Sequence, residues 1–526
     1  MRQKFIGSAG SGKTRTIIER LSELVRDPHE VSFASLTNAA KDEITSRICS
    51  LYGTTAESLA KANWRTTHST ALRATGLSDD LIYPGTADYD KFCSKACNVP
   101  LAGFRSSDAA DALQLWDLAR MAGKPLRNVH RTAAVSTPKL ANYAKVATYV
   151  RQYEAAKRRD TLVDVIDPLM RFCGITMTIE GRLDRVRPEG DVPDDIRVLV
   201  LDEAQDASFL IYEAQRRLEV EGRPEHLILA ADPYQSIFGF LGGDPRFFLD
   251  WETDETITMP RSWRCAPDIF ALGQRCLQGT TGYVDYGISP ADHDGKVSYA
   301  NIMHVQQAVE QAGDGSIMVL ARTRQIAADI AAEIDEPTAT IGGGADTLAA
   351  KFRTLHDLQN GRIVSAADMA EASKQLNAKG FFERGLHAKW KRGEVSVDEV
   401  VPWKLAEAGF SEGGVGLIAS GKWVDAVKDS TAAAKWQRAV DLHGVDVACN
   451  PRIKVGTIHS SKGLEADGVI LATELPETTV KAITRFREAR DEEMRVSYVG
   501  VTRARRNLVV LNNPVNDRRA KWVRSY

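Results

Sequence analysis

The sequence lacks several features that would place it in a specialised class. The 526 residues include only seven cysteines, and no two of them form a CxxC pair. This argues against a disulfide scaffold or a structural zinc site. No apolar run approaches about 18 residues, so no membrane span is expected, and no apolar signal region follows Met1. Neither charge is in excess, with Lys+Arg 68 against Asp+Glu 70, so no global basic surface marks a polyanionic partner. We therefore expect a reduced, cytoplasmic, globular protein.

The first chemical motif lies close to Met1. A glycine-rich stretch fills the pattern GxxxxGK[ST] at every fixed position, and a short apolar segment, Phe5-Ile6, precedes it. Small residues let backbone N–H groups face a phosphate chain, and the helix expected from about Thr14 to Val25 directs its positive end at the same anion. Lys13 would reach the β- and γ-phosphates, and Thr14 would bind Mg²⁺. The loop consists of Gly7, Ser8, Ala9, Gly10, Ser11, Gly12, Lys13 and Thr14.

An acidic pair follows the continuous apolar run Val198–Leu201, which is typical of a strand buried in a parallel sheet. Asp202 would hold Mg²⁺, and Glu203 is placed to activate the attacking water. Alone, such a cluster is more often a helix N-cap. Behind a phosphate loop, the catalytic interpretation is favoured.

Other apolar runs indicate the fold class. The run Leu227–Ala231 also ends in polar residues, and parallel α/β sheets build their sites at the carboxyl ends of strands. Further runs at Ile317–Ala321, Val469–Ala472 and Leu508–Leu511 predict a second parallel sheet. The sequence therefore predicts an α/β protein with two lobes and one phosphate loop.

The order of the motifs resembles that of the UvrD/Rep-like superfamily 1A DNA helicases, from residue 7 to about residue 510. Besides the phosphate loop, the segments that carry the resemblance are Ser35–Lys41, Thr66–Ser69, Asp202–Asp206, Asp232–Phe238, Ser262–Cys265, Thr457–Glu465 and Tyr498–Arg505. The resemblance implies two RecA-like P-loop lobes, each with a mainly α-helical insertion. It also implies ATP and Mg²⁺ as cofactors and 3′→5′ movement on single-stranded DNA.

The resemblance assigns roles to individual residues. Gln235 would sense the γ-phosphate, Arg264 would contact it, and Arg503 would be the arginine finger. Glu465 would belong to the nucleotide site, and Lys462 would link the strand-binding residues to the nucleotide. The implied DNA contacts are Thr37, Asn38, Thr67, His68, Phe240, Thr457 and His459.

The sequence departs from the family pattern at several points. Only six residues precede Gly7, so the adenine-reading Gln motif is missing and weak base selectivity is expected. Leu36 replaces a common aromatic residue, and Leu241 replaces an arginine. The compact form is typical of a phage-type member, acting in a bacterial cell or a phage-infected host.

The sequence divides the chain into two lobes, each with a helical insertion. Loop-forming segments such as Pro337 and Gly342-Gly343-Gly344 mark a boundary between these parts. The expected order is lobe 1 at 1–72, its insertion at 73–148, lobe 1 again at 149–256, lobe 2 at 257–340, its insertion at 341–450, and lobe 2 again at 451–526. The chain should cross to lobe 2 near Trp251–Met259, and no strand is expected at 73–148.

Two local basic segments are candidate phosphate contacts. The first comprises Arg120, Lys124, Arg127 and Arg131, and the second comprises Arg384, Lys389, Lys391 and Arg392 around Trp390. Charge runs of this kind are more often simply solvated. The second segment fits a strand or duplex better because it combines an aromatic residue with cations.

The expected function is that of a monomeric helicase and translocase that acts on single-stranded DNA and on junctions with duplex. Replication, repair or recombination proteins are the expected partners. Two rivals stay open: a DNA-stimulated ATPase that displaces proteins with little unwinding, and a non-catalytic DNA-binding or recruiting module. The intact Lys13, Glu203 and Arg503 argue against the second rival.

Overall fold

The computed structural model describes most of the chain. Outside the description lie residues 36–37, 78–80, 137–141, 194–195, 343–347, 378–379, 514–518, 521 and 524–526, and the side chains of 38–40 and 134–136. The chain divides into two compact units. The first consists of Met1–Ser298, Ser461–Glu465 and Thr473–Tyr526, and the second of Tyr299–Ser460 and Ala466–Ala472. None of the described helices combines the length and the apolar character needed to cross a lipid bilayer.

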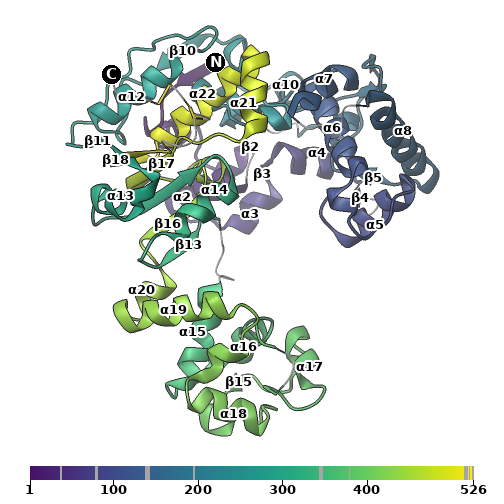
Figure 1. Ribbon diagram of the computed structural model, residues 1–526. Helices are drawn as coiled ribbons and strands as arrows, with labels where there is room; N and C mark the ends of the chain where they lie inside the picture. Colours follow the sequence, from purple (N-terminus) through teal and green to yellow (C-terminus); the bar gives the residue numbers. More distant parts are fainter. Residues whose placement is uncertain are drawn as a thin grey trace. The chain divides into compact units, whose positions relative to one another are not determined.

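The first unit is built on a parallel sheet in the order β10-β1-β9-β8-β2-β3 (Figure 1). Its strands are β1 (Arg2–Ile6), β2 (Val31–Ser35), β3 (Asn63–Thr66), β8 (Val198–Asp202), β9 (His226–Ala231) and β10 (Glu255–Thr258). β8 is buried along its whole length, as the apolar run predicted. The predicted strands at Phe5-Ile6, Val198–Leu201 and Leu227–Ala231 are confirmed.

Helices cover both faces of this sheet. Ile17 and Leu21 of α1 (Lys13–Leu24) pack with Phe33 and Val200 on one face. On the other face, Leu210 and other apolar residues of α10 (Phe209–Gly222) pack with Leu199 and Leu229. The other helices of this part are α2 (Asn38–Tyr52), α3 (Ala56–Lys61), α4 (Thr67–Thr75) and α9 (Asp167–Phe172). Alternate residues of each strand thus serve opposite cores.

Part of the segment Trp251–Met259, where the crossing to the second lobe is predicted, forms β10 at the edge of the first sheet. β10 pairs in parallel with β1, from Gln3 opposite Glu255 to Ile6 opposite Thr258. The pairing satisfies backbone groups at the edge of β1, and Ile257 packs against the core beneath it. The expected boundary at 256 therefore falls inside β10.

A helical insertion follows α4 in the first unit. Its helices are α5 (Ala87–Ala96), α6 (Asp108–Ala122), α7 (Leu126–Ser136) and α8 (Tyr143–Asp160). They enclose a core that includes Trp116 and Tyr153. The expected boundary at 148 falls inside α8, because its residues on both sides of 148 pack into this core. A short strand also occurs where none was expected: β4 (Leu81–Ile82) pairs with β5 (Val163–Asp164).

The rest of the first unit comes from more distant parts of the chain. It includes a hairpin, β6 (Ile175–Met177) with β7 (Leu183–Arg185), and α11 (Arg246–Leu249), α12 (Pro267–Leu277), α21 (Glu477–Arg485), α22 (Arg487–Val501) and β18 (Ala504–Asn512). α22 packs against α12, and Gly273 of α12 lies close to Tyr498 and Thr502. The last part of the chain therefore helps to build the same unit as the phosphate loop.

The second unit contains parallel strands in the order β17-β12-β16-β13. They are β12 (Ile317–Ala321), β13 (Thr338–Thr340), β16 (Ile453–Thr457) and β17 (Ala466–Ala472), with α13 (Val305–Ala312) and α14 (Arg324–Ala332) beside them. β11 (Lys296–Asn301) spans the division between the units. The prediction of a second parallel sheet is confirmed for Ile317–Ala321 and Val469–Ala472.

The expected break around Pro337 and Gly342 contains a strand. β13 pairs with β16 from Thr338 opposite Ile453 to Thr340 opposite Val455, because a proline just before a strand loses no ladder hydrogen bond within it. Gly343 and Gly344 lie outside the described residues.

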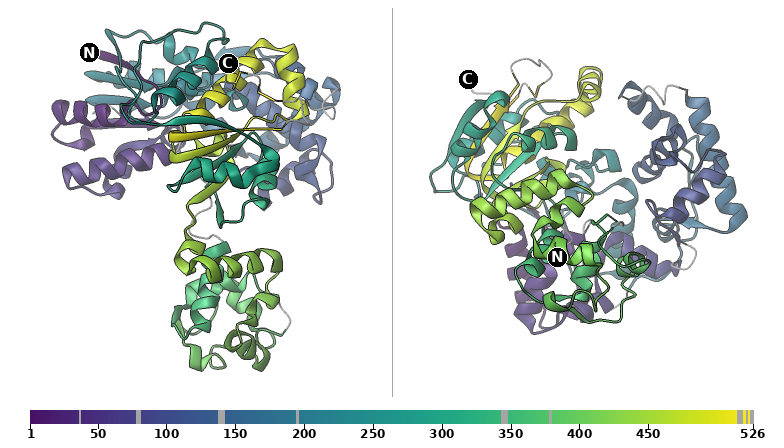
Figure 2. Two further views of the ribbon diagram at one scale, coloured as in Figure 1. Left: turned by 60° about the vertical axis from the view of Figure 1, so that its left-hand side comes forward. Right: turned by 60° about the horizontal axis from the view of Figure 1, so that its bottom comes forward.

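The second unit also carries a helical insertion, whose helices gather into one body (Figure 2). They are α15 (Leu348–Gln359), α16 (Ala366–Ser373), α17 (Leu386–Arg392), α18 (Glu412–Ala419), α19 (Ser430–His443) and α20 (Val445–Cys449), with a small antiparallel pair, β14 (Val364–Ser365) and β15 (Glu399–Val400). Trp390, Trp423 and Trp436 fill its core.

Trp390 is therefore unsuited to the surface role that the sequence suggested for it. Its side chain is fully buried, and its indole N–H donates to the carbonyl of Ala408 at 3.1 Å. The flanking cations remain on a helix whose aromatic residue is structural.

Candidate active site

The glycine-rich loop joins β1 to α1 and leaves two buried hydroxyls without partners among the described residues. Gly10 and Gly12 have positive φ angles of 70° and 86°, which favour glycine and turn the chain sharply before the helix. Lys13 donates to the carbonyl of Ser8 at 3.1 Å. The hydroxyls of Ser8 and Ser11 are buried, and neither has a hydrogen-bond partner among the described residues. Buried unpaired donors at a helix N-terminus suit an anion such as a phosphate chain.

The acidic pair lies at the carboxyl end of β8. Asp202 is buried and accepts a hydrogen bond from the backbone N–H of Glu203 at 2.9 Å. Burial raises the pKa of Asp202 to about 7, Glu203 adds to the rise, and Lys13 opposes it. Burial would also raise the pKa of Glu203, but the charges of Lys462 and Lys13 lower it overall. Environments that separate the pKa values of two carboxyl groups suit different chemical roles for them.

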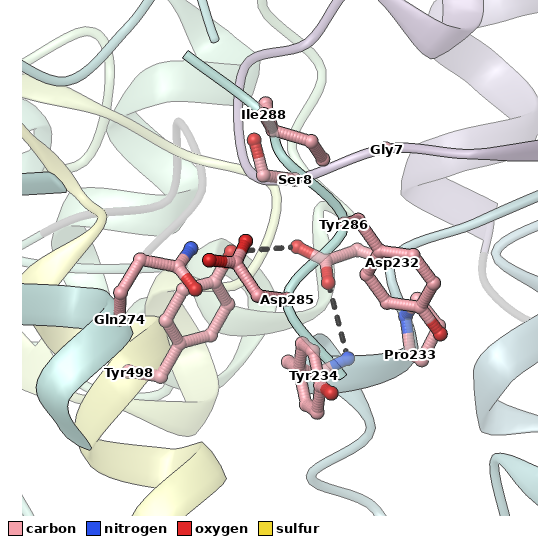
Figure 3. Close-up of a pocket in the computed structure, with 10 residues that line it drawn as sticks. All are labelled: Gly7, Ser8, Asp232, Pro233, Tyr234, Gln274, Asp285, Tyr286, Ile288 and Tyr498. Carbon is pink, nitrogen blue, oxygen red and sulfur yellow. Dashed lines mark hydrogen bonds between the residues drawn. The ribbon is translucent and has the colours of Figure 1, made fainter. Parts of the chain in front are cut away.

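Gln235 is held between an aspartate and an arginine. Its amide donates to Asp232 at 2.8 Å, and its carbonyl accepts from Arg503 at 3.1 Å. Asp232 also accepts from the hydroxyl of Tyr498 at 3.0 Å, so helix α22 is tied to the end of β9 (Figure 3). These bonds fix the side chain of Gln235 from both ends.

Two arginines approach the same loop from other segments. Arg503 is fully buried, and besides Gln235 it donates to the carbonyls of Val499 and Leu464, each at 3.1 Å. Burial and the nearby charge of Arg264 lower the pKa of Arg503. Two guanidinium groups held near each other in a buried site favour an anionic ligand.

Arg264 lies against the phosphate loop itself. A Cβ added at Gly10 would come within 2.3 Å of the Cβ of Arg264, so only glycine fits there. The neighbouring backbone is fixed, since Trp263 N donates to the carbonyl of Gly10 at 2.8 Å and Ser262 Oγ donates to that of Ala9 at 2.7 Å. The guanidinium of Arg264 donates to Glu465 at 2.6 Å.

A small hollow lies beside the start of the phosphate loop (Figure 3). Its lining residues are Gly7, Ser8, Asp232, Pro233, Tyr234, Gln274, Asp285, Tyr286, Ile288 and Tyr498. Three tyrosine rings and two aspartates belong to this lining. The cationic side chains around the loop, Lys13, Arg264 and Arg503, are not part of it. The start of the loop is therefore bordered by open space on this side.

The candidate strand-binding residues differ in their accessibility. Phe240 is 53% exposed, and its ring meets Phe238 edge to face with centroids 5.9 Å apart. Thr67 is buried and accepts from the amide of Gln215 at 3.4 Å. Burial lowers the pKa of the neighbouring His68 to about 4.

The remaining strand-binding candidates lie outside the described residues or in the second unit. Thr37 and the side chain of Asn38 lie outside the described residues. Thr457 and His459 belong to the second unit, at the end of β16. The hydroxyl of Thr457 accepts from the backbone N–H of Ser460 at 3.1 Å.

Arg120 is excluded as a phosphate contact. Its side chain is 2% exposed and is paired with Asp117, Asp164 and Asp167. The surrounding sequence could not show this, because the carboxylates that bury Arg120 lie up to 47 residues away.

Sequence reasoning missed two residues of the site. Trp263 is 65% exposed, and its ring lies 3.9 Å from the position of a Cβ at Gly12. Tyr498 donates to Asp232 and accepts from the backbone N–H of Ala9 at 3.4 Å. Both residues lie within motif segments, Ser262–Cys265 and Tyr498–Arg505, that also contain Arg264 and Arg503. The motifs could therefore have identified them.

Comparison with protein-family models agrees with this geometry. Residues 3–256 match the UvrD/REP helicase N-terminal domain, and residues 440–513 match the UvrD-like helicase C-terminal domain. The chain belongs to the UvrD/REP helicase family. Both matched segments contribute to the first unit, which contains the phosphate loop and Arg503.

Curated members of the UvrD/REP family are similar to this chain over different lengths. ATP-dependent DNA helicase UvrD2 of Mycobacterium tuberculosis is 26% identical over 560 residues, covering 96% of this chain and 75% of the relative. ATP-dependent DNA helicase PcrA of Leuconostoc citreum is 24% identical, over 50% of this chain and 35% of the relative. DNA helicase II of Escherichia coli is 24% identical, over 53% of this chain and 38% of the relative.

Proposed function

We propose that this chain couples ATP hydrolysis to 3′→5′ movement along single-stranded DNA and to the separation of duplex at junctions. The observation that carries the proposal is the gathering of a phosphate loop, a carboxylate pair and two arginines within one unit. Membership of a helicase family supports it, as do the names of the similar proteins. Proteins of replication, repair or recombination are the expected partners of a monomeric enzyme.

The residues of the site divide the chemistry of phosphoryl transfer among them. Lys13, with the loop amides and the hydroxyls of Ser8 and Ser11, would hold the phosphate chain. Thr14 and Asp202 suit Mg²⁺, because the raised pKa of Asp202 marks a buried carboxylate short of positive charge. When bound, the cation neutralises charge on the phosphates.

The remaining roles belong to groups that act on water and on developing charge. Glu203, kept ionised by nearby lysines, would accept a proton from the attacking water. Gln235 would orient that water and the γ-phosphate from its fixed position. Arg264 and Arg503 would stabilise the charge that develops in the transition state, while Glu465 holds Arg264 in place.

The nucleotide base would stack on Trp263. The exposed indole lies next to Gly12, and a ring face accepts any base, because stacking does not read hydrogen-bonding edges. We therefore propose weak base selectivity. Hydrolysis rates with ATP, GTP, CTP and UTP should lie within about tenfold of one another, and a strict preference for ATP would contradict the proposal.

The strand would be held by local contacts, as the balanced net charge requires. Phe240 is the proposed stacking platform, and Thr37, Asn38, His68, Thr457 and His459 are proposed strand contacts. Buried Thr67 would act by holding the start of α4. Binding should weaken with salt because phosphates remain part of the contact.

We propose that the lobes are two RecA-like domains and that the two insertions correspond to α5–α8 and α15–α20. These insertions are compact, each with its own apolar core. Small insertions also fit an enzyme that displaces proteins from DNA and unwinds little. An unwinding assay separates this second candidate from the first.

The test uses forked duplexes with a 3′ or a 5′ single-stranded tail. The wild type should unwind the 3′-tailed substrate with ATP and Mg²⁺, and Lys13→Ala and Glu203→Gln should lose hydrolysis by about 100-fold or more while still binding the strand. Efficient unwinding from a 5′ tail would refute the polarity. Stimulated hydrolysis with no unwinding would favour the protein-displacing ATPase, and undiminished hydrolysis in both variants would refute the catalytic assignment.

A further inference from the structure

Two helices of the first unit, α12 and α22, lead to the two arginines near the phosphate loop. α12 begins shortly after Arg264, and α22 ends shortly before Arg503. The helices are joined at this end, where Nη1 of Arg264 and Sγ of Cys265 donate to the carbonyl of Thr502 at 3.4 and 3.6 Å. The placement of the two guanidinium groups therefore depends on how α12 and α22 lie against each other.

The two helices approach each other closely at Gly273 of α12. A Cβ added at this glycine would lie 3.2 Å from Cγ2 of Thr502 and 3.4 Å from Cδ2 of Tyr498. Because glycine has no side chain to interlock with the facing helix, this contact resists rotation less than a contact between larger side chains would. A second contact, away from Gly273, would fix the relative position of the helices.

Trp522 makes such a contact with both helices. Its indole N–H donates to Oγ of Ser497 on α22 at 2.8 Å, and its backbone carbonyl accepts from Sγ of Cys276 on α12 at 3.8 Å. Along α12, Cys276 lies beyond Gly273, and along α22, Ser497 precedes Tyr498. Trp522 therefore joins the helices on the side of Gly273 that faces away from the arginines.

The segment that carries Trp522 is anchored by contacts of its own. Ala520 is buried, and its backbone N–H donates to the carbonyl of Thr473 at 2.8 Å. An isolated antiparallel bridge also pairs Glu474 with Arg519. All these residues belong to the first unit. Because the segment is held independently of the two helices, Trp522 can restrain them instead of following their movement.

α22 passes its position on to the site through two side chains. The hydroxyl of Tyr498, the residue next to Ser497, donates to Asp232 at 3.0 Å. Arg503 donates to the side-chain carbonyl of Gln235 at 3.1 Å. A rotation or shift of α22 would move both groups, and a misplacement of about 1 Å can cost about 100-fold in rate.

We infer that Trp522 is a positioning residue, which holds α12 and α22 so that Arg264 and Arg503 meet the phosphoryl group in flight. The inference rests on the proposed function, which assigns both arginines to the charge that develops in the transition state. Trp522 is not among the residues that would hold the nucleotide. Its contribution should therefore appear in the transition state and not in nucleotide binding.

The experiment uses the full chain with saturating oligothymidylate and measures kcat and KM for ATP. Calorimetry gives the affinities for Mg–ADP with and without aluminium fluoride, which imitates the phosphoryl group in flight. Trp522→Phe removes the indole N–H and keeps an aromatic ring. Its kcat and its affinity for the aluminium fluoride complex should each fall about fivefold, with KM and the affinity for Mg–ADP unchanged. Ser497→Ala, which removes the acceptor, should behave in the same way.

Trp423→Phe is the matched control. It removes an indole N–H that donates at the same distance, 2.8 Å, to Gln359 in the second insertion. Urea denaturation should show a similar loss of stability in both tryptophan variants, because each loses one hydrogen bond of the same kind. The control should nevertheless keep the kcat and both affinities of the wild type. Equal catalytic losses in Trp423→Phe and Trp522→Phe would mean that stability alone is responsible, and would overturn the inference.

A further comparison asks whether Trp522 acts through the arginines. In the variant Arg264→Gln/Arg503→Gln, adding Trp522→Phe should not lower the affinity for the aluminium fluoride complex any further. A second loss of about fivefold would overturn the inference, as would an unchanged kcat in either Trp522→Phe or Ser497→Ala, or an equal loss of affinity for Mg–ADP. If Trp522→Phe fails to fold, Ser497→Ala decides by the same criteria.

Failure of the proposed function would look different. Glu203→Gln would then retain hydrolysis, or Arg264→Gln/Arg503→Gln would hydrolyse ATP as fast as the wild type, whatever the behaviour of Trp522. An enzyme that needs Glu203 and both arginines but shows no loss in the Trp522 and Ser497 variants contradicts only the positioning role.

Discussion

Two buried clusters of charge in the first unit have opposite character. In the helical insertion, Asp164 accepts from Arg120 at 2.8 Å and from Lys157 and Tyr153 at 2.7 and 2.9 Å. Burial would raise the pKa of Asp164, but Arg120 and Lys157 hold it well below its usual range. At the phosphate loop, by contrast, burial raises the pKa of Asp202, and burial with Arg264 lowers the pKa of Arg503.

The difference separates a structural cluster from a functional one. Around Asp164, Arg120 and Lys157 stabilise the ionised carboxylate, so the central charge of this complete cluster is balanced within the protein, although burial raises the pKa of the flanking Asp117 and Asp167. Around the phosphate loop, burial disfavours the charged forms of Asp202 and Arg503, and the hydroxyls of Ser8 and Ser11 have no partner among the described residues. A ligand that carries both a cation and phosphate oxygens would supply the missing partners of these groups, because the protein itself does not supply them.

Breaking the complete cluster should have the largest effect on stability. Asp164→Asn leaves Arg120 and Lys157 buried without their central carboxylate, and we expect a loss of about 3–5 kcal/mol in the free energy of unfolding. Urea denaturation measures this loss. Asp160→Asn, which removes an exposed carboxylate paired with Arg159, should leave the curve unchanged. An equally small effect at Asp164 would contradict the contrast between the clusters.

Filling the incomplete cluster should stabilise the protein. A non-hydrolysable ATP analogue with Mg²⁺ at about 100 times its Kd should add about 2.7 kcal/mol to the free energy of unfolding. Lys13→Ala should lose most of this gain, measured as a shift in Tm. Lys145→Ala, which removes an exposed lysine from the insertion, is the control and should keep it. Equal stabilisation of both variants would place the ligand elsewhere.

Two aromatic residues extend the same comparison from charge to apolar surface. Phe240→Ala should weaken strand binding by about 1–3 kcal/mol with little change in stability, since the ring is half exposed. Trp390→Ala should instead lower stability by about 3–5 kcal/mol, because it empties the core of the second insertion. Anisotropy titrations should show a loss of strand affinity for Phe240→Ala, and denaturation curves should show a loss of stability for Trp390→Ala. A loss of strand affinity without a loss of stability in Trp390→Ala would return that residue to the nucleic-acid surface.

The smallest effect concerns pH. The pKa of Asp164 is lower in the folded than in the unfolded chain, so its contribution to stability is fully present above the unfolded value of about 4 and is lost as the pH falls from there through the lower folded value. The stability gap between wild type and Asp164→Asn should therefore be constant from pH 7 to about pH 5 and should narrow below about pH 4. A gap that widens as the pH falls would mean that the sign of the shift is wrong.

Local sequence predicted the elements whose causes are local. The run Val198–Leu201 is apolar at every position and forms β8, and Gly10 and Gly12 of the phosphate loop adopt the positive φ angles that favour glycine. The boundary predicted at 256 falls inside β10, because β10 is defined by its pairing with β1, some 250 residues earlier. Arg120 and Trp390 failed for the same reason, since distant residues bury them.

Sequence by itself therefore determined the chemical groups of this protein and their order, because motif spacing fixes which side chains follow which strand or helix. Tertiary structure alone decided which groups meet. Gln235 and Arg503 are 268 residues apart and share a hydrogen bond, and Lys462 reaches Asp206 across 256 residues. Burial, and with it every shifted pKa of the site, arises only when these segments pack together, because desolvation depends on all neighbours in space.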